Sequence, residues 1–302
     1  MELTEFQNKV SALLPTAELR FNEAMSRHTS FRVGGGAEVM AFPKNTDELS
    51  DILKVSGLLD VKPAILGAGT NVLAPDEGLP GLVICLKDCL GGMEALGENR
   101  IFVAAGVTMT RAAVFAANLG LSGMEFAHGI PGTIGGGIYM NAGAYGGELK
   151  DICCSVDVMD LDGNIHRRTV EQMGFSYRHS ILEEEPGIVV GAIFQLTPMN
   201  PDDIKAKMKE LQTKRSASQP LDYPSAGSAF KRPVGGYAAA LIDEAGLKGY
   251  TVGDAAISMK HAGFAVNLGN ATAADVRKLL AQVSDIVFEK SGIRLESEIR
   301  IW

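Results

Sequence analysis

Apolar residues recur at two different spacings along the chain, and these spacings predict where helices and strands alternate. Apolar positions three and four residues apart, between a capping residue and a helix breaker, are typical of amphipathic helices. We expect such helices at 3–14, 46–59, 108–119, after Pro201 and at about 236–245. The most regular one begins after the N-cap Thr272 and ends before Gly292, with one apolar face formed by Val276, Leu279, Leu280, Val283 and Val287.

Short apolar runs and alternating patterns predict strands between these helices. We expect strands following the glycine turn within 31–43, at 63–66, 82–86, 101–106 and 187–196, and a hairpin around the Asp162–Gly163 turn. The last ten residues alternate as a final strand, which would place Arg294, Glu296, Glu298 and Arg300 on one face. Because the pattern changes at Asn200–Pro201, the sequence predicts two α+β domains, 1–200 and 201–302.

Two glycine-rich loops interrupt this pattern and are the first sign of chemistry. Eight of the nineteen residues of 129–147 are glycine, and a second loop, LGAGTN, follows the predicted strand at 63–66. Glycine lets another group approach the main chain closely, and successive backbone N–H groups in such turns bind anions. Two such loops suggest a long, phosphate-bearing cofactor held by backbone; two tight turns in a β-rich domain are the alternative.

Composition narrows the classes of partner. A net charge of −8 argues against a general nucleic-acid or membrane-surface binder, although Lys205, Lys207, Lys209, Lys214 and Arg215 could serve one anionic ligand. The N-terminus lacks the basic-then-apolar order of a signal peptide, and no span is long and apolar enough for lipid, so we expect a cytoplasmic protein. Cys85, Cys89, Cys153 and Cys154 lack zinc-site spacing and are expected to be buried, reduced thiols; we predict no metal site.

The glycine loops do not form the dinucleotide-binding fingerprint of a Rossmann fold. That fingerprint requires a strand, the pattern GxGxxG and then a helix. The run Gly34–Gly36 precedes a strand, the loop 66–71 leads into turn-like sequence, and the chain that follows Gly132–Gly137 is too rich in glycine for a helix.

Seven sequence blocks follow one another from about Arg27 to Arg300. They are FRVGGGAE, LGAGTNVLAPDEG, GVTMTRAAVFAANLGLSGMEFAHGIPGTIGGGIYMNAGAYGGE, YRHS, PLDYPSAGSAFKRP, HAGFAVN and LESEIR. Together, and in this order, they resemble the UDP-N-acetylenolpyruvoylglucosamine reductase (MurB) family of bacterial peptidoglycan synthesis. The path from Arg178 to Ser228 leaves no room for the tyrosine-bearing insertion of the longer family type. The chain therefore resembles the shorter type.

The resemblance implies a two-subdomain FAD-binding fold of the vanillyl-alcohol-oxidase type, followed by a C-terminal α+β substrate-binding domain. It implies one FAD, bound non-covalently because LGAGTN contains no histidine, with NADPH as the reductant; no dinucleotide motif fixes the preference over NADH. The expected FAD contacts are Gly67, Ala68, Gly69, Thr70, Asn71, Gly129, Pro131, Gly132, Gly136, Asn141 and Gly143.

The resemblance also implies the reaction and three catalytic residues. A hydride passes from flavin N5 to the terminal carbon of an enolpyruvyl ether on a UDP-sugar, and the carbon beside the carboxylate takes a proton. Ser228 is the matched proton donor, Arg178 binds the substrate carboxylate, and Glu298 completes the site near that carboxylate. Periodicity alone does not choose between Glu296 and Glu298; the family pattern chooses Glu298. Arg215 and Lys231 are the candidates for the UDP phosphates.

Two other functions remain open from the residues. Another flavin oxidoreductase on the same fold would explain the glycine loops but not the blocks YRHS, SAGSAF and LESEIR. A non-catalytic binder of a nucleotide or UDP-sugar would need neither a flavin nor the three catalytic side chains. Among the histidines, His261 has a packing or hydrogen-bonding role at least as readily as a catalytic one. We expect a monomer that acts on small molecules.

Overall fold

The computed structural model of the chain describes residues 4–302, which divide into two compact units. Unit 1 runs to Phe21 and also contains Glu38–Ala68 and Gly81–Lys214. Unit 2 contains Asn22–Ala37, Gly69–Pro80 and Arg215–Trp302. The units therefore differ in outline from the predicted domains 1–200 and 201–302, because two segments from the first third of the chain belong to unit 2.

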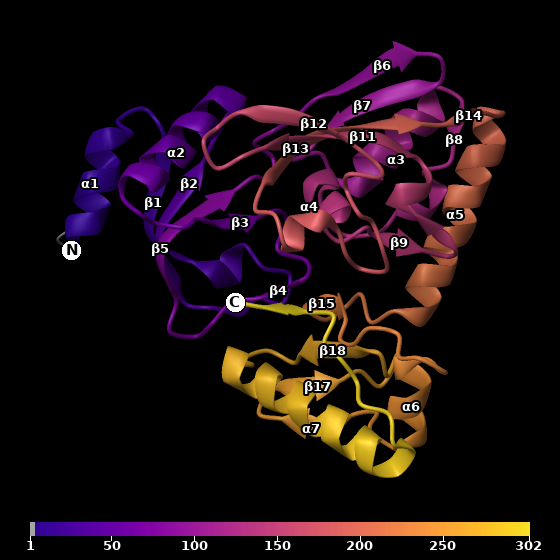
Figure 1. Cartoon of the computed structure of the whole chain (residues 1–302). Coiled ribbons are helices and arrows are strands. Elements are labelled where there is room, and N and C mark those ends of the chain that lie inside the picture. The colour runs from indigo at the N-terminus through magenta and orange to yellow at the C-terminus, as the bar shows by residue number, and fades with distance from the viewer. Residues whose placement is uncertain (1–3) are drawn as a thin grey trace. The chain divides into compact units, whose positions relative to one another are not determined.

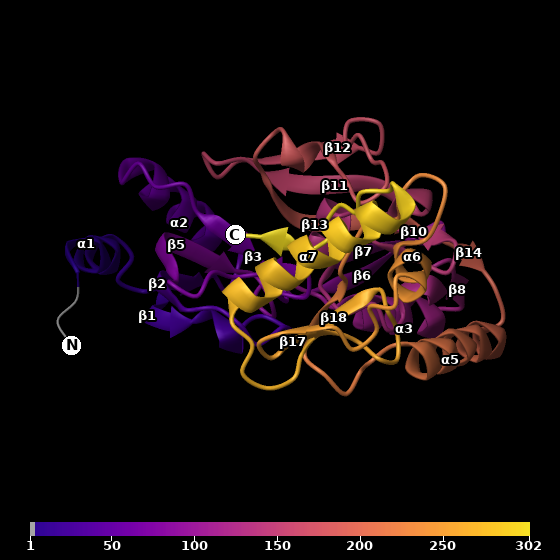
Figure 2. The same cartoon turned by 90° about the horizontal axis from the view of Figure 1, so that it is seen from below.

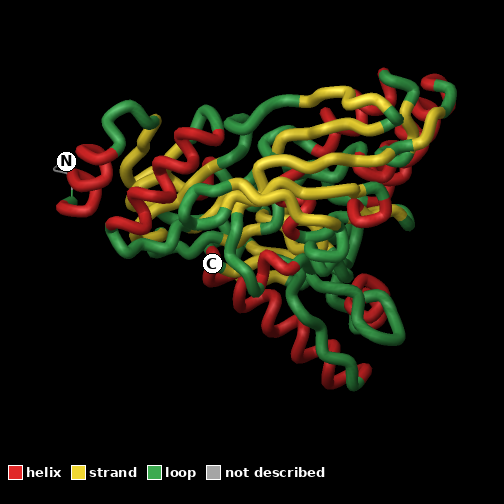
Figure 3. Tube along the Cα trace, turned by 45° about the horizontal axis from the view of Figure 1, so that its top comes forward, coloured by secondary structure: helices red, strands yellow, loops and turns green. Residues whose placement is uncertain are grey.

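Unit 1 contains a five-stranded antiparallel sheet. Figure 3 shows its strands as yellow bands that run side by side. The order is β12-β11-β13-β7-β6, and the predicted hairpin at Asp162–Gly163 joins β11 to β12. The strands are β6 (Met93–Gly97), β7 (Arg100–Ala104), β11 (Cys153–Met159), β12 (Ile165–Thr169) and β13 (Ile188–Gln195).

A second sheet is covered by a predicted helix. Its order is β1-β2-β5-β3, and β3 pairs with β5 in parallel. Leu49, Ile52 and Leu53 of α2 are fully buried in the same apolar core as Val39 and Ile84 of this sheet. The elements are α1 (Glu5–Leu13), β1 (Glu18–Ala24), β2 (Gly36–Phe42), α2 (Thr46–Leu58), β3 (Ala64–Leu66) and β5 (Leu79–Cys85).

The remaining helices of unit 1 pack into the same core. Figures 1 and 2 both show α5 running beside α3, and Ile204 and Met208 of α5 are buried. The elements are α3 (Met109–Asn118), β8 (Leu121–Ser122), η2 (Glu125–Ala127), α4 (Ile134–Tyr139), β9 (Gly143–Ala144), β10 (Gly147–Glu148), η3 (Leu149–Asp151), η4 (Ile181–Glu183), β14 (Thr197–Pro198) and α5 (Pro201–Ser218).

Unit 2 consists of a small antiparallel sheet against which α7 lies (Figure 1). The sheet order is β15-β18-β17-β16, and a separate parallel pair joins β4 to β19. The elements are η1 (Met25–Arg27), β4 (Val72–Leu73), β15 (Ser225–Ser228), α6 (Ala238–Glu244), β16 (Thr251–Val252), β17 (Ala255–Ile257), β18 (Phe264–Asn267), α7 (Ala273–Ser291) and β19 (Arg300–Ile301).

The apolar core of unit 2 explains why the two early segments belong to it. Phe31 and Leu73, one from each segment, are at most 1% exposed and share a core with Val276 and Val283 of α7 and with Ile299. A fully buried side chain of this size contributes roughly 1.5–3 kcal/mol to folding. The early segments therefore supply part of the core that the C-terminal residues require.

The predicted N-cap Thr272 is confirmed, and α2 and α3 begin with caps of the same kind. The side chains of Asn45, Thr108 and Thr272 each accept a hydrogen bond from the backbone three residues later, and Thr272 forms a full capping box with Asp275. At its other end α7 terminates with Gly292 in the left-handed conformation, at φ 71°. Helix α1 begins at Glu5, and the expected start at Leu3 lies outside the described residues.

The predicted strand over the last ten residues is wrong for most of its length. Only Arg300–Ile301 forms a strand, and Ser297 makes an isolated bridge with Phe230, although Leu295 and Ile299 are buried on one face as alternation predicts. The reason is a change of hydrogen-bonding partner. The N–H of Glu298 donates to Ala229, whereas the N–H groups of Arg300 and Trp302 donate to Asn71 and Leu73.

A short helix, α4, forms inside the second glycine loop, where the sequence predicted none. Thr133 caps it, and Ile134 and Ile138 are buried one turn apart. The helix is only six residues long and follows the 3₁₀ turn η2 rather than a strand. The exclusion of a Rossmann fingerprint is therefore unchanged.

The four cysteines are free thiols. Cys85 and Cys153 are buried as predicted, while Cys89 and Cys154 are only partly buried. Burial raises the pKa of Cys89 to about 11 and that of Cys153 to about 12, so both thiols stay protonated near neutral pH. Within residues 4–302, no helix has the length and apolar character needed to cross a membrane.

We predict that Asp76 stabilises unit 2 by capping α7. Its two carboxylate oxygens accept hydrogen bonds from the N–H groups of Ala273 (2.7 Å) and Ala274 (2.9 Å), the first residues of the helix. Asp76→Ala should lower the free energy of unfolding by about 1–2 kcal/mol, the usual scale for losing a charged N-terminal cap. Urea unfolding of the cofactor-free protein measures this. Glu77→Ala, one residue away, is the matched control, and equal stability of the two variants would contradict the prediction.

Candidate active site

The first glycine loop lies directly after β3 and passes from unit 1 into unit 2 between Ala68 and Gly69. In unit 1 it meets the second glycine loop: a Cβ atom on Gly67 would lie 2.9 Å from the Thr133 hydroxyl oxygen. The structure thus brings together the two loops that the sequence predicted to bind one cofactor. The close approach requires a residue without a side chain at position 67.

Gly69 is the residue of this loop for which no other amino acid fits. Its φ is +62°, and an added Cβ would lie 2.0 Å from the carbonyl oxygen of His28. The N–H of Ser30 donates to the carbonyl of Gly69 at 3.0 Å, which fixes the loop against the segment before β2. From Gly69 onward, the loop backbone is therefore held within unit 2.

The second loop uses part of its backbone to hold itself in unit 1. The N–H groups of Ile134 and Gly135 donate to Val107 and Ala105, and Gly129 donates to the Thr110 hydroxyl. Gly136 donates to the Thr133 hydroxyl at a long 3.5 Å. Of the predicted contacts here, Gly129 and Gly132 have positive φ, at 85° and 133°, as expected for a loop shaped by glycine.

Asn141, a predicted FAD contact, directs its side chain into the protein. It is 0% exposed. Its amide donates to the Glu148 carboxylate and to the carbonyl of Ser176, both at 2.9 Å, and its oxygen accepts from the N–H of Lys150 at 3.0 Å. With all three bonds made within unit 1, this side chain ties the glycine loop to the segment that carries Arg178.

Arg178 lies in a tight turn in which Ser176 and His179 exchange backbone hydrogen bonds. Its φ of +56° is unusual for a residue with a side chain, and such strain is common at functional sites. The guanidinium donates to the carbonyl of Gly143 at 3.3 Å and stacks over the Tyr177 ring at 4.9 Å. The side chain is therefore positioned by the second glycine loop.

The charges around Arg178 include an ionised carboxylate. Burial tends to raise the pKa of Glu148, but hydrogen bonds from Lys150 and Asn141 and the charges of Lys150 and Arg178 outweigh it and lower this pKa below its usual value. Glu148 is thus negative at neutral pH. It offsets part of the positive charge that Lys150 and Arg178 bring to unit 1.

Ser228 and Glu298 are brought together within unit 2. Ser228 ends β15 and pairs with Phe264 of β18. The N–H of Glu298 donates to the carbonyl of Ala229, the residue after Ser228, at 3.0 Å. Two residues distant in sequence therefore lie on neighbouring backbone segments, while Arg178 belongs to unit 1.

Glu296 and Glu298 have different surroundings in the structure, a difference that the alternating sequence pattern could not reveal. The side chain of Glu296 is 73% exposed and forms an ion pair with Lys231 at 2.5 Å, whereas Glu298 is partly buried. Lys231, a candidate for the UDP phosphates, is therefore already paired with a carboxylate. The second candidate, Arg215, is buried at the end of α5 and donates to Gln219 at 3.3 Å.

His261 has the contacts of a packing residue. Its Nδ1 atom accepts a hydrogen bond from the N–H of Gly263 at 3.1 Å, and its ring packs edge-to-face against Phe264. Burial lowers the pKa of His261, which keeps the ring neutral and able to accept that bond. These contacts support the packing interpretation.

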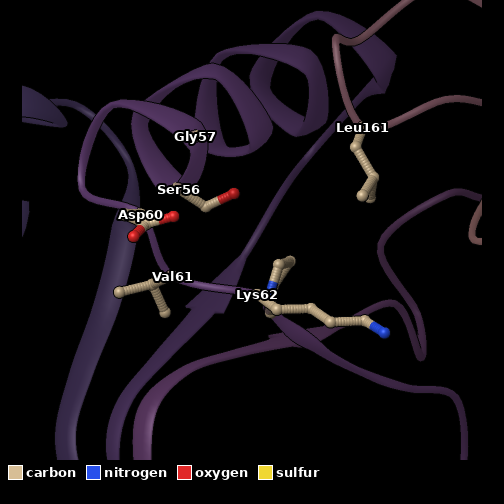
Figure 4. A pocket seen from close by; sticks show the side chains of 7 residues that line it. Ser56, Gly57, Asp60, Val61, Lys62 and Leu161 are labelled. Carbon is tan, nitrogen blue, oxygen red and sulfur yellow. The ribbon is translucent and has the colours of Figure 1, made fainter.

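The hollow shown in Figure 4 is not this site. It has a volume of about 240 Å³ and is lined by residues at the end of α2 together with Leu161 of the β11–β12 turn. None of the predicted site residues lines it. A second hollow of about 370 Å³ in unit 1 is lined by Glu125, Phe126, Tyr145, Lys207, Leu211 and Lys214.

We predict that Gly69→Ala weakens FAD binding by at least about tenfold, because a side chain at positive φ is strained and would collide with the His28 carbonyl. A flavin fluorescence titration of the cofactor-free protein gives the affinity. Gly57→Ala is the matched control: Gly57 lies in α2, and an added Cβ there meets nothing within 4 Å. Wild-type affinity in the Gly69→Ala protein would exclude this loop as the FAD site.

Comparisons with known proteins agree with this arrangement in both parts of the chain. Residues 37–169 match the model of an FAD binding domain, and residues 219–302 match the C-terminal domain of UDP-N-acetylenolpyruvoylglucosamine reductase. A structure of alkyldihydroxyacetonephosphate synthase, 14% identical and covering 66% of this chain and 41% of that one, superposes with a TM-score of 0.50, which bears on the fold alone. The predicted flavin-binding α+β fold and the FAD cofactor are confirmed.

Full-length relatives extend the match to nearly the whole chain. The UDP-N-acetylenolpyruvoylglucosamine reductases of Caldanaerobacter subterraneus and Agathobacter rectalis are 46% and 43% identical, over 97% and 98% of both chains in each pair. The crystal structure of the Thermus caldophilus enzyme superposes with a TM-score of 0.78 at 36% identity, covering 95% of this chain and 98% of that one. The chain belongs to the UDP-N-acetylenolpyruvoylglucosamine reductase family.

Proposed function

We propose that this protein reduces UDP-N-acetylglucosamine enolpyruvate to UDP-N-acetylmuramate, using FAD and NADPH, in the synthesis of peptidoglycan precursors. The observation that carries the proposal is the hydrogen bond from the N–H of Glu298 to the carbonyl of Ala229. Through this bond, the segment that contains Glu298 lies beside Ser228. Family membership makes this pair meaningful, since a simple UDP-sugar binder would need no such pair. Bound FAD would supply the hydride from its N5 atom.

The glycine loops fit such a cofactor. Gly67 approaches the Thr133 side chain closely, and Gly69 adopts a φ that favours glycine. Backbone N–H groups bind a pyrophosphate without a side chain that must be desolvated. We assign Gly67–Asn71 and the backbone of Gly129–Gly143 to FAD, bound without a covalent link. The side chains of Asn71 and Asn141 serve the protein rather than the cofactor.

Arg178 binds the substrate carboxylate in this proposal. As the enolpyruvyl double bond is reduced, negative charge develops on the carbon beside that carboxylate. A fork-shaped guanidinium can bind both carboxylate oxygens and stabilise this charge. The turn that holds Arg178, its bond to Gly143 and its stacking on Tyr177 fix the guanidinium before substrate arrives, which lowers the cost of orienting it.

Ser228 gives its hydroxyl proton to the same carbon, and Glu298 lies beside it. A hydroxyl is a weak acid, but an enolate is a strong base, so position matters more than a shifted pKa. Ser228 is exposed, so a substrate can reach its hydroxyl. Lys231 and Arg215 are the proposed phosphate contacts; Lys231 would exchange its exposed ion pair with Glu296 for the phosphate.

We further propose that the enzyme is a cytoplasmic monomer. NADPH and UDP-sugars are metabolites of the cytoplasm, which is where we place the enzyme. Each unit buries an apolar core of its own within the chain, which supports a monomer. Light scattering coupled to size exclusion tests the oligomeric state.

A colourless preparation that cannot be reconstituted with FAD would favour the alternative function, a non-catalytic binder of a nucleotide or UDP-sugar.

We predict that Ser228→Ala separates the two half-reactions. The variant should bind FAD and be reduced by NADPH at the wild-type rate, because that step needs no proton from serine. Oxidation of the reduced enzyme by the enolpyruvyl substrate should slow by roughly a hundredfold or more, the scale for losing a positioned acid. Stopped-flow flavin absorbance times each step. Ser225→Ala, in the same strand, is the control, and equal slowing of both steps would rule out Ser228 as the donor.

A pair of variants tests the assignment of Glu298. Glu298→Gln should slow the oxidative half-reaction by roughly tenfold to a hundredfold, because the amide cannot reproduce the acid–base character of the carboxyl group. Glu296→Gln should stay within about threefold of wild type, since an exposed ion pair contributes little. Single-turnover measurements with pre-reduced enzyme give both rates. The opposite ranking would assign the catalytic carboxylate to Glu296.

A further inference from the structure

The side chain of Asn71, at the end of the first glycine loop, bonds to the segment that carries Glu298. Its amide nitrogen donates to the carbonyl oxygen of Glu298 at 3.0 Å. The backbone carbonyl of Asn71 accepts a hydrogen bond from the N–H of Arg300, also at 3.0 Å. Asn71 therefore holds the peptide units on both sides of Ile299, one through its side chain and one through its backbone.

The Glu298 backbone is fixed from a second side by the strand of Ser228. Its N–H donates to the carbonyl of Ala229 at 3.0 Å, while its C=O accepts from Asn71. Glu298 lies between an isolated antiparallel bridge, which Ser297 makes with Phe230, and β19, which covers only Arg300–Ile301. The Asn71 side chain supplies the bond that a neighbouring strand would otherwise provide.

The glycine loop is connected to β15 by a further residue. Ser30 donates its N–H to the carbonyl of Gly69 at 3.0 Å and its hydroxyl to the carbonyl of Ser225 at 2.6 Å. Ser225 begins the strand that ends at Ser228. The loop segment from Gly69 to Asn71 is thus bonded within unit 2 to the backbone of Glu298 and, through Ser30, to the strand of Ser228.

We propose that Asn71 is a positioning residue that couples the FAD-binding loop to Glu298. Ordering of the loop by the cofactor orders the Glu298 peptide through the side-chain bond, so that the carboxyl group is held in its working position when FAD is bound. This inference rests on the proposed function, because it takes Glu298 as the carboxyl group of the active site. It gives the side chain of Asn71 a task different from direct contact with the cofactor.

The bond from Asn71 affects the rate by fixing the position of Glu298. Without the Asn71 amide, the Glu298 carbonyl would lose this bond, while the bond from the Glu298 N–H to the carbonyl of Ala229 would remain. A displacement of about 1 Å in a catalytic group can cost roughly a hundredfold in rate, so a partial loss of about tenfold is expected. Asn71→Asp keeps the size of the side chain but cannot donate, and its carboxylate oxygen would face the carbonyl oxygen.

A double-mutant cycle tests the coupling in the FAD-loaded enzyme. Asn71→Asp should slow the oxidative half-reaction by about tenfold or more, while reduction by NADPH stays within about threefold. In a Glu298→Gln background the same change should add less than about twofold, because the residue through which Asn71 acts is already impaired. Slowing of both half-reactions alike, or the same slowing in both backgrounds, would overturn the proposal.

Hydrogen exchange provides a readout that does not depend on activity. In the wild-type protein, FAD should increase the protection of the backbone N–H groups of 296–302, measured by mass spectrometry; in Asn71→Asp most of this increase should be lost. Asn267→Asp is the matched control, because Asn267 makes the same kind of bond within unit 2, to the carbonyl of Phe31. Unchanged protection of 296–302 in Asn71→Asp would overturn the coupling.

The outcomes distinguish this inference from the proposed function. Wild-type oxidation in Glu298→Gln would remove the catalytic role of Glu298, and the inference with it. A slow Glu298→Gln enzyme together with a wild-type rate in Asn71→Asp would overturn the inference alone. Weaker FAD binding in Asn71→Asp, with wild-type rates once FAD is saturating, would make Asn71 a cofactor ligand and would also overturn it.

Discussion

The backbone hydrogen bonds made by the last residues of the chain organise unit 2. Between Glu296 and Trp302 the chain first bonds to Ala229 and Lys231 and then turns to bond to Asn71 and Leu73. The first set places Glu298 beside Ser228, and the second fixes the residues that follow the glycine loop. Because Leu73 and Ile299 are also buried in one core, the same short segment supports both the packing and the site.

Much of the helical structure could be predicted because its signals are local. Asn45, Thr108 and Thr272 are caps whose partners lie three residues away, so the sequence alone contains the whole interaction. The last ten residues could not be predicted in this way. Their alternation indicates a strand, but the change of partner from Ala229 to Asn71 depends on segments that are remote in sequence.

The glycine-rich helix α4 shows how packing overrides helix propensity. Three consecutive glycines make a helix unfavourable in isolation. Here an added Cβ on Gly135 would lie 3.0 Å from the Cβ of Ala105, and one on Gly137 would lie 2.9 Å from the Met109 sulfur. The helix forms because its neighbours can approach its backbone closely, and no periodicity in the sequence reports those neighbours.

The surroundings of the candidate site residues could be predicted for some positions and not for others, for related reasons. Gly67 and Gly69 could be predicted because glycine itself reports a close approach or an unusual φ. The sequence missed that the side chains of Asn71 and Asn141 bond inside the protein, since an asparagine in a loop has the same local pattern whether it faces a ligand or a carbonyl. The surroundings of Glu296 and Glu298 differ because Glu296 forms an ion pair with Lys231, which is also remote in sequence.

The discontinuous make-up of unit 2 has a consequence for how the protein is made. Phe31 and Leu73 leave the ribosome early, but their core partners Val276, Val283 and Ile299 are synthesised last. Unit 1 can begin to pack while translation continues, whereas unit 2 must wait for the C-terminus, and contacts of such long sequence separation form slowly. During that interval the nascent chain exposes apolar surface that chaperones would shield. A fragment limited to residues 219–302 would lack Phe31 and Leu73, which belong to this core.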